Sequence, residues 1–445
     1  MADSITAPRL AHNRWPSIAL TFLLALLASC SPRQEPTTLT FPHGWAFRPE
    51  ELARRAALSL QFTRETGIRV RDIPTPESAF DQLELFSKLL RQGSADLLGV
   101  DLIWSGTLEP DLIDLQPYSA ADISSIMPQL LPDYTVEGRV VAVPYQVNIG
   151  SLEYRADLLR EYGYDHPPKT WDELEGMAKR IQAGERGKGK KDFWGFVWQG
   201  AESEALTCNA LEWQVAAGGG RIIESDRTIS VNNPAAIRAW QRARRWIGWI
   251  SPPSVIAYRE RDSMNVFDSG EAAFNRVWLG TSVARSGASA AVYWRGLEPR
   301  VKTGFTTLPA GAAGSGGTLG GAGLAVSRHS AHPREAVRLV HFLVHAQIES
   351  IEKLRNASDH QPEFYNLPPV LDVYSHSTAT QDGSAVIHRP SIETGAQYTN
   401  VSKAYAAAVH SVLSGQKAAP EAAAELEKQL ISITGFRPGP PTAWK

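Results

Sequence analysis

The chain has 445 residues, 43% of them hydrophobic, and a formal net charge of −2 at pH 7. This length allows two or three domains with large cores. The near-neutral charge excludes a strong global field that would favour nucleic acid or anionic lipid, so we expect no nucleic-acid partner. Thirteen Trp and twelve Tyr are many, and such amphipathic rings are common platforms for ligands.

The N-terminus is predicted to be a secretory signal peptide over residues 1–29. Arg9 and Arg14 precede an unbroken apolar stretch at 18–28. A helix of that length rises roughly 16 Å, about half of the ~30 Å that a membrane-spanning helix must cross. A basic flank, a short apolar run and small residues behind it are typical of a signal peptide.

The end of this run resembles the bacterial lipobox, in which a cysteine is acylated and becomes the first mature residue. Its residues are Leu27, Ala28, Ser29 and Cys30. We therefore predict that Cys30 is the lipid attachment site and that residues 30–37, polar and Pro-containing, form a flexible tether. The alternative is an ordinary signal peptide cleaved nearby. With Cys30 acylated, Cys208 would be the one free cysteine of the mature chain, which is too few for an internal disulfide.

From Thr38 onward strand-like runs alternate with amphipathic helices, which predicts α/β layers. The predicted strands are residues 39–41, 68–70, 95–104 and 140–145. A helix that contains Leu52, Ala56, Leu60 and Phe62 is expected after the first strand. Further helices are expected to begin at Thr170, with Glu173 completing a capping box, at Asn233 with Pro234, and at Pro333.

Several polar or aromatic residues lie where an α/β sheet presents ligands, near strand ends. Asp101 and Asn148 interrupt apolar runs, and Trp278 ends another. The alternatives are a structural hydrogen bond for Asp101 and core packing for Trp278. The Gly- and Ala-rich segment 310–323 is expected to let backbone approach something closely.

Enzymatic and metal sites find little support. Gly314, Ser315 and Gly316 do not form a nucleophile elbow. His341 and His345 are spaced as metal ligands can be, but we expect them on a solvated helix flank. Glu202 and Glu204 could serve a glycosidase, which uses two carboxylates. We predict no catalytic residues, no metal and no cofactor.

Taken in order, many segments resemble the extracellular sugar-binding proteins of ABC importers, a family that includes the maltose- and trehalose/maltose-binding proteins. One such segment is Pro-Pro-Lys-Thr-Trp-Asp-Glu-Leu at 167–174. The others are residues 100–104, 143–145, 152–159, 195–201, 204–208, 250–253, 267–274, 319–321 and 324–327. They span nearly the whole mature chain, and 195–208 is most similar to the trehalose/maltose branch.

The resemblance implies a two-lobed, type II periplasmic-binding-protein-like α/β fold with the ligand between lobes joined by a hinge. The first lobe would comprise residues 38–146 and 301–347, and the second 147–300 and 348–445. The implied sugar contacts are Asp101, Asn148, Trp278, Gly320 and Gly321, and we add Trp45 and Glu204 as candidates. Two positions depart from the trehalose/maltose pattern: a Trp is replaced by Ala322 and an Arg by Val370.

We therefore expect a lipid-anchored, periplasmic or extracellular binding protein for a mono- or disaccharide. It would act as a monomer, close about its hinge on the sugar, and pass it to separate permease subunits. The alternatives are a secreted glycoside-acting enzyme and a scaffold lipoprotein that has lost ligand binding.

Overall fold

The computed structural model describes residues 36–44, 49–76, 78–118, 131–280, 303–356 and 385–442. The predicted signal peptide, Cys30, Trp45 and Val370 lie outside these ranges. The described residues from Thr38 onward pack as one unit. In the ranges just given, no helix is both long enough and apolar enough to cross a membrane.

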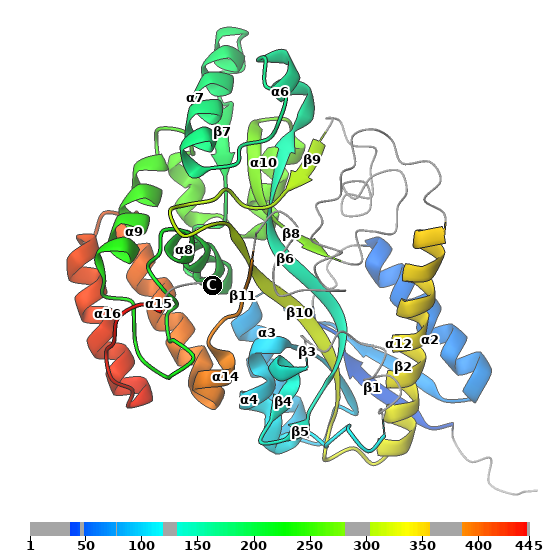
Figure 1. The fold of residues 1–445 in the computed structure, drawn as a ribbon. Helices are drawn as coiled ribbons and strands as arrows, with labels where there is room; N and C mark the ends of the chain where they lie inside the picture. Colours follow the sequence, from blue (N-terminus) through cyan, green and yellow to red (C-terminus); the bar gives the residue numbers. More distant parts are fainter. Residues whose placement is uncertain are drawn as a thin grey trace, which may run out of the picture. The chain divides into compact units, whose positions relative to one another are not determined.

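A mixed sheet runs through this unit, and two long strands form its centre (Figure 1). The strands β6 (Val143–Arg155) and β10 (Gly316–Val326) pair antiparallel. β10 also pairs with β3 (Leu97–Asp101) and β11 (Ala385–Ile387). β6 pairs with β8 (Ala272–Gly280) and β9 (Thr303–Thr306), and β8 pairs with β7 (Trp194–Val197).

Helices surround both ends of these central strands (Figure 1). Around one end lie α6 (Ala156–Glu161), α7 (Trp171–Gly187), α8 (Glu204–Ala216), α9 (Pro234–Trp246), α10 (Glu260–Asp268), α15 (Tyr398–Leu413) and α16 (Ala419–Thr434). Around the other lie α2 (Pro49–Thr66), α3 (Ala79–Arg91), α4 (Ser105–Leu108) and α12 (Pro333–Asn356). Two small sheets pair β1 (Thr38–Pro42) with β2 (Arg69–Ile73) and β4 (Thr135–Val136) with β5 (Arg139–Val140), and α14 (Ser391–Thr394) precedes α15.

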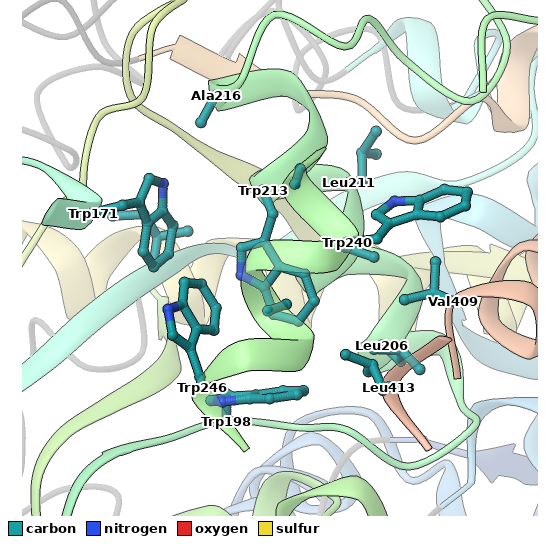
Figure 2. Packing of buried hydrophobic residues seen from close by; sticks show 14 of the residues in the cluster. Trp171, Trp198, Leu206, Leu211, Trp213, Ala216, Trp240, Trp246, Val409 and Leu413 are labelled. Carbon is teal, nitrogen blue, oxygen red and sulfur yellow. The ribbon is translucent and has the colours of Figure 1, made fainter. Parts of the chain in front are cut away.

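Most of the tryptophans near α8 belong to the core. In the largest buried cluster, Trp213 meets Trp198 edge-to-face at 5.0 Å and Trp246 at 5.5 Å between ring centroids. Figure 2 shows these rings together with Trp171, which stacks on Trp246 at 5.3 Å. Edge-to-face and offset pairs of this kind add stability beyond burial alone. The high tryptophan count therefore reflects core packing more than ligand binding.

The predicted helix caps are present, with one difference. Thr170 Oγ1 accepts the Glu173 backbone N–H at 3.2 Å, but the Glu173 carboxylate accepts the N–H of Lys169, not of Thr170, at 2.7 Å. Asn233 Oδ1 accepts two backbone N–H groups of α9, each at 3.0 Å. These side chains satisfy N–H groups that a helix leaves unpaired at its start.

The helix expected after the first strand is present as α2, in which Leu52 and Leu60 are 52% and 62% exposed and Phe62 is buried. Three sequence predictions are corrected. The strand predicted over 95–104 ends at Asp101, and a 3₁₀ helix, Leu102–Trp104, follows. The strand predicted over 140–145 is divided: Val140 ends β5, and β6 begins at Val143 and extends to Arg155. The Gly-rich segment contributes the central strand β10, which its composition did not suggest.

Candidate functional site

Four adjacent strands bring most of the predicted contact residues together. In the sheet, Ala322 of β10 lies opposite Asp101 of β3, and Gly320 lies opposite Asn148 of β6. On the other side of β6, Gly150 lies opposite Trp278 of β8. Because neighbouring strands lie about 4.8 Å apart, these residues occupy one region of the sheet. We call Asp101, Asn148, Trp278 and Gly320 the candidate binding site.

Gly320 lies under two side chains of this site. A Cβ atom at position 320 would lie 2.1 Å from Asn148 Oδ1 and 2.9 Å from Trp278 Cζ3. Asn148 and Trp278 are half-buried, whereas Gly320 is buried. The missing side chain therefore allows the amide and the indole to reach over β10. At Gly321 the close neighbour is backbone, because a Cβ there would lie 2.3 Å from Gln146 O.

Replacing Gly320 with alanine should therefore weaken ligand binding at least about tenfold, because the new methyl group must displace Asn148 and Trp278, and one decade corresponds to only ~1.4 kcal/mol. Calorimetric titration checks this. Gly176→Ala is the matched control, since Gly176 lies inside α7 with no atom near its Cβ position and should keep full affinity. Unchanged affinity in Gly320→Ala would show that the two side chains do not act on the ligand.

Asp101 combines a structural and a potential binding role. It is 6% exposed, and its Oδ1 accepts the Ile103 backbone N–H at 3.2 Å and Arg389 Nη2–H at 3.4 Å. Its Oδ2 accepts no hydrogen bond from the residues that the structure describes. Burial raises the pKa of Asp101 to about 6, opposed by the Arg389 guanidinium. The carboxylate is thus ionised at neutral pH with one oxygen available.

Arg389 is a central residue that the sequence analysis missed. It is 2% exposed, and besides Asp101 it donates to Glu204 Oε1 at 2.9 Å and to Leu319 O at 3.1 Å. The available signal was an ionic residue two positions after the apolar strand β11 and directly before Pro390. Arg389 connects β3, β10 and α8, so it links the surroundings of Asp101 to the N-terminus of a core helix.

Glu204 lies beyond Arg389, and its carboxylate is occupied by protein groups. Tyr398 Oη–H donates to Oε1 and Ser402 Oγ–H to Oε2, both at 2.5 Å. Burial raises the pKa of Tyr398 well above its usual range, so its hydroxyl stays a donor. Glu202 is exposed, and no group of three or more His, Cys, Asp or Glu side chains in the described ranges could hold a metal ion.

Comparison with known proteins places the chain in a family. The model of bacterial extracellular solute-binding proteins matches residues 49–348. The chain is 36% identical over 392 residues to the "Probable ABC transporter-binding protein" of Deinococcus radiodurans, covering 84% of this chain and 89% of that protein. Maltose-bound MalE3 of T. maritima aligns with TM-score 0.74 and 28% identity, over 89% of this chain and all of that one.

A solute-binding protein from Thermotoga lettingae, bound with α-D-tagatose, shares the fold at TM-score 0.72 and 21% identity, over 90% of this chain and 100% of that one. The chain belongs to the bacterial extracellular solute-binding protein family. Its α/β fold is the two-lobed type II fold of periplasmic binding proteins. It is a solute-binding protein and not an enzyme, and its family places it in the periplasm or outside the cell.

Proposed function

We propose that this chain is the lipid-anchored binding component of an ABC-type importer for a neutral mono- or disaccharide, trehalose- or maltose-like in character. The observation that carries the proposal is that the Asp101 carboxylate, the Asn148 amide and the half-buried Trp278 indole lie near one another on neighbouring strands of one sheet. Sugars present hydroxyl groups around an apolar ring face. Charged and amide acceptors suit the hydroxyls, and an aromatic ring suits the apolar face.

The charges around the site also favour a neutral ligand. Arg389 is paired with Asp101 and Glu204, and Arg276 is paired with Glu212 at 2.5 Å. Both guanidinium groups are buried and already bound by carboxylates, so neither is ready to bind a phosphate group. The maltose-bound relative supports a sugar of this kind, while Ala322 in place of a tryptophan points to a ligand with fewer stacking contacts.

The distribution of the buried cores supports two lobes that close on the ligand. Two core clusters draw on residues 39–149 and 319–344, with Tyr398 added. The largest cluster draws on residues 152–308 and 387–430. Apart from Val147, Ile149, Leu308 and Tyr398, this division follows the predicted lobes, and β6 and β10 run from one to the other. We propose that these strands form the hinge and that the closed monomer docks on the permease.

Panels of neutral sugars test the proposal. Ligands that bind the native state raise the apparent melting temperature by mass action. Maltose, trehalose, simple hexoses and sugar alcohols should include at least one stabilising compound, and sugar phosphates should give no shift. A set in which sugar phosphates alone stabilise the protein would contradict a neutral ligand.

Replacing Cys30 with alanine should release the protein from the membrane fraction without unfolding it, because a diacylglyceryl group supplies the two chains that stable anchoring requires. Cell fractionation and the melting temperature of the released protein check this. Cys208→Ala, which alters a buried core thiol, is the control and should leave the protein in the membrane fraction. A Cys30→Ala protein that stays with membranes in high salt would place the anchor elsewhere.

Sugar affinity should fall as the pH drops through about 6, where Asp101 becomes protonated. Hydrogen bonds to charged groups are stronger than neutral ones by about 1 kcal/mol, so a loss of several-fold is expected. The pKa of Asp101 is higher in the folded chain than in the unfolded chain, so protonation of Asp101 stabilises the fold. The expected loss of sugar affinity therefore cannot result from unfolding caused by this protonation. Titrations with maltose between about pH 5 and 8 check this. Asp101→Asn should bind weakly without this dependence.

A further inference from the structure

A buried arginine lies against the ring of Trp278. Arg276 Cζ is 4.0 Å from the centroid of the Trp278 ring. The two residues are two positions apart on β8, so their side chains leave the same face of the strand. Arg276 is 1% exposed, and its Nη1 has no hydrogen-bond acceptor among the described residues. The indole face is thus a principal contact of this guanidinium, as cation–π geometry allows.

Glu212 of α8 holds the Arg276 guanidinium in place. Arg276 Nε–H and Nη2–H donate to the two carboxylate oxygens of Glu212, at 3.1 and 2.5 Å. Glu212 Oε1 also accepts the Thr318 backbone N–H at 3.0 Å and its hydroxyl at 2.8 Å. A bidentate pair with further donors defines the plane of the guanidinium. Glu212 therefore ties Arg276 to β10, two residues before Gly320.

Neighbouring glycines leave room for this arrangement. A Cβ at Gly150, the partner of Trp278 in the sheet, would lie 1.9 Å from Glu212 Oε1 and 2.5 Å from Arg276 Nη2. At the ring edge, a Cβ at Gly320 would lie 2.9 Å from Trp278 Cζ3. Trp278 is thus contacted on one face by Arg276 and approached at one edge by Gly320.

We propose that Arg276 is a positioning residue for the ligand: held by Glu212, it covers one face of Trp278 and fixes the tilt at which the opposite face meets the sugar. This rests on the proposed function, since it takes Trp278 as the stacking residue. The guanidinium on one face also weakens the attraction of the Trp278 ring for a second cation, because its positive charge offsets part of the negative electrostatic potential of the ring. The site should therefore prefer a neutral sugar over an amino sugar.

The test combines a ligand-free and a ligand-bound measurement. Protein labelled with ¹⁵N at indole nitrogens reports the Trp278 Nε1–H resonance, which Trp278→Phe identifies. Maltose and glucosamine are the titrated probes. Arg276→Met alone leaves the buried Glu212 carboxylate without its ion-pair partner, so the double variant Glu212→Gln with Arg276→Met removes both charges. Arg276→Lys keeps the positive charge without the planar group. Arg186→Met is the matched control, because Arg186 lies 4.4 Å from the Trp194 ring centroid, in a pair outside the site.

We expect the double variant and Arg276→Lys to move or broaden the Trp278 resonance and to weaken maltose binding about tenfold, with a smaller loss for glucosamine. Arg186→Met should do neither. A Trp278 resonance unchanged in both variants overturns the inference whether or not maltose binds. If Trp278→Phe weakens maltose binding but the Arg276 variants bind normally, the inference fails and the proposed function stands. If the resonance moves but wild-type protein binds neither probe, the positioning contact stands and the proposed sugar is wrong.

Discussion

Replacing Arg389 with methionine should lower the free energy of unfolding by about 3–5 kcal/mol, the typical effect of removing one partner from a buried ion pair. The guanidinium is 2% exposed and binds two carboxylates, those of Asp101 and Glu204, together with Leu319 O. Without it, two buried acidic groups lose their counter-charge. Chemical denaturation with matched slopes measures the change.

The contrasting variant is Lys417→Met, which removes one partner of an exposed ion pair with Glu425. Exposed pairs contribute about 0–1 kcal/mol, so this protein should remain near wild-type stability. Arg389→Lys should fall between the two, because an ammonium group keeps the charge but cannot reach three acceptors in one plane. An Arg389→Met protein as stable as Lys417→Met would show that the buried contacts do not support the fold.

Exchanging Trp278 for alanine should weaken sugar binding by about ten- to a hundredfold, corresponding to the ~1–3 kcal/mol expected from an aromatic contact. The ring is half-buried and lies over Gly320 beside Asn148, so its removal takes away a platform rather than a core side chain. The melting temperature should change much less than in variants of the tryptophan cluster around Trp213. Calorimetric titration and thermal melting together check both statements.

Trp249→Ala provides the control for this experiment, because Trp249 is 39% exposed and lies in the turn after α9. It should leave sugar affinity unchanged. The structural alternative for Trp278 predicts the reverse pattern, a large loss of melting temperature with normal affinity in the protein that remains folded. That pattern would remove Trp278 from the binding site.

Local signals in the sequence predicted local structure well. The N-caps at Thr170 and Asn233 were visible because a cap depends on residues two or three positions away. β10 was missed because glycine is depleted in strands, and here its glycines are explained by neighbours on other strands, such as Gly150 O near Gly317. A close approach between two segments that are far apart in the sequence cannot be predicted from either segment alone.

The candidate site shows the same limit. Asp101, Asn148 and Trp278 became candidates because each is unusual in its own segment, and the sheet register places them near one another. Arg389 was not found, because its partner Asp101 is 288 positions away. Asp101 itself was placed inside a strand, whereas its carboxylate caps the 3₁₀ helix that ends the strand. Ion pairs between distant segments become visible only in the folded chain.

The most direct test of the account is a calorimetric titration of the purified mature protein with the best sugar from the panel, followed by chromatography of the sugar after overnight incubation. The account predicts saturable one-to-one binding, affinity about ten- to a hundredfold weaker in Trp278→Ala, and full recovery of intact sugar. Conversion of the sugar to products by purified protein, or the absence of saturable binding to any neutral sugar or sugar alcohol, would contradict it.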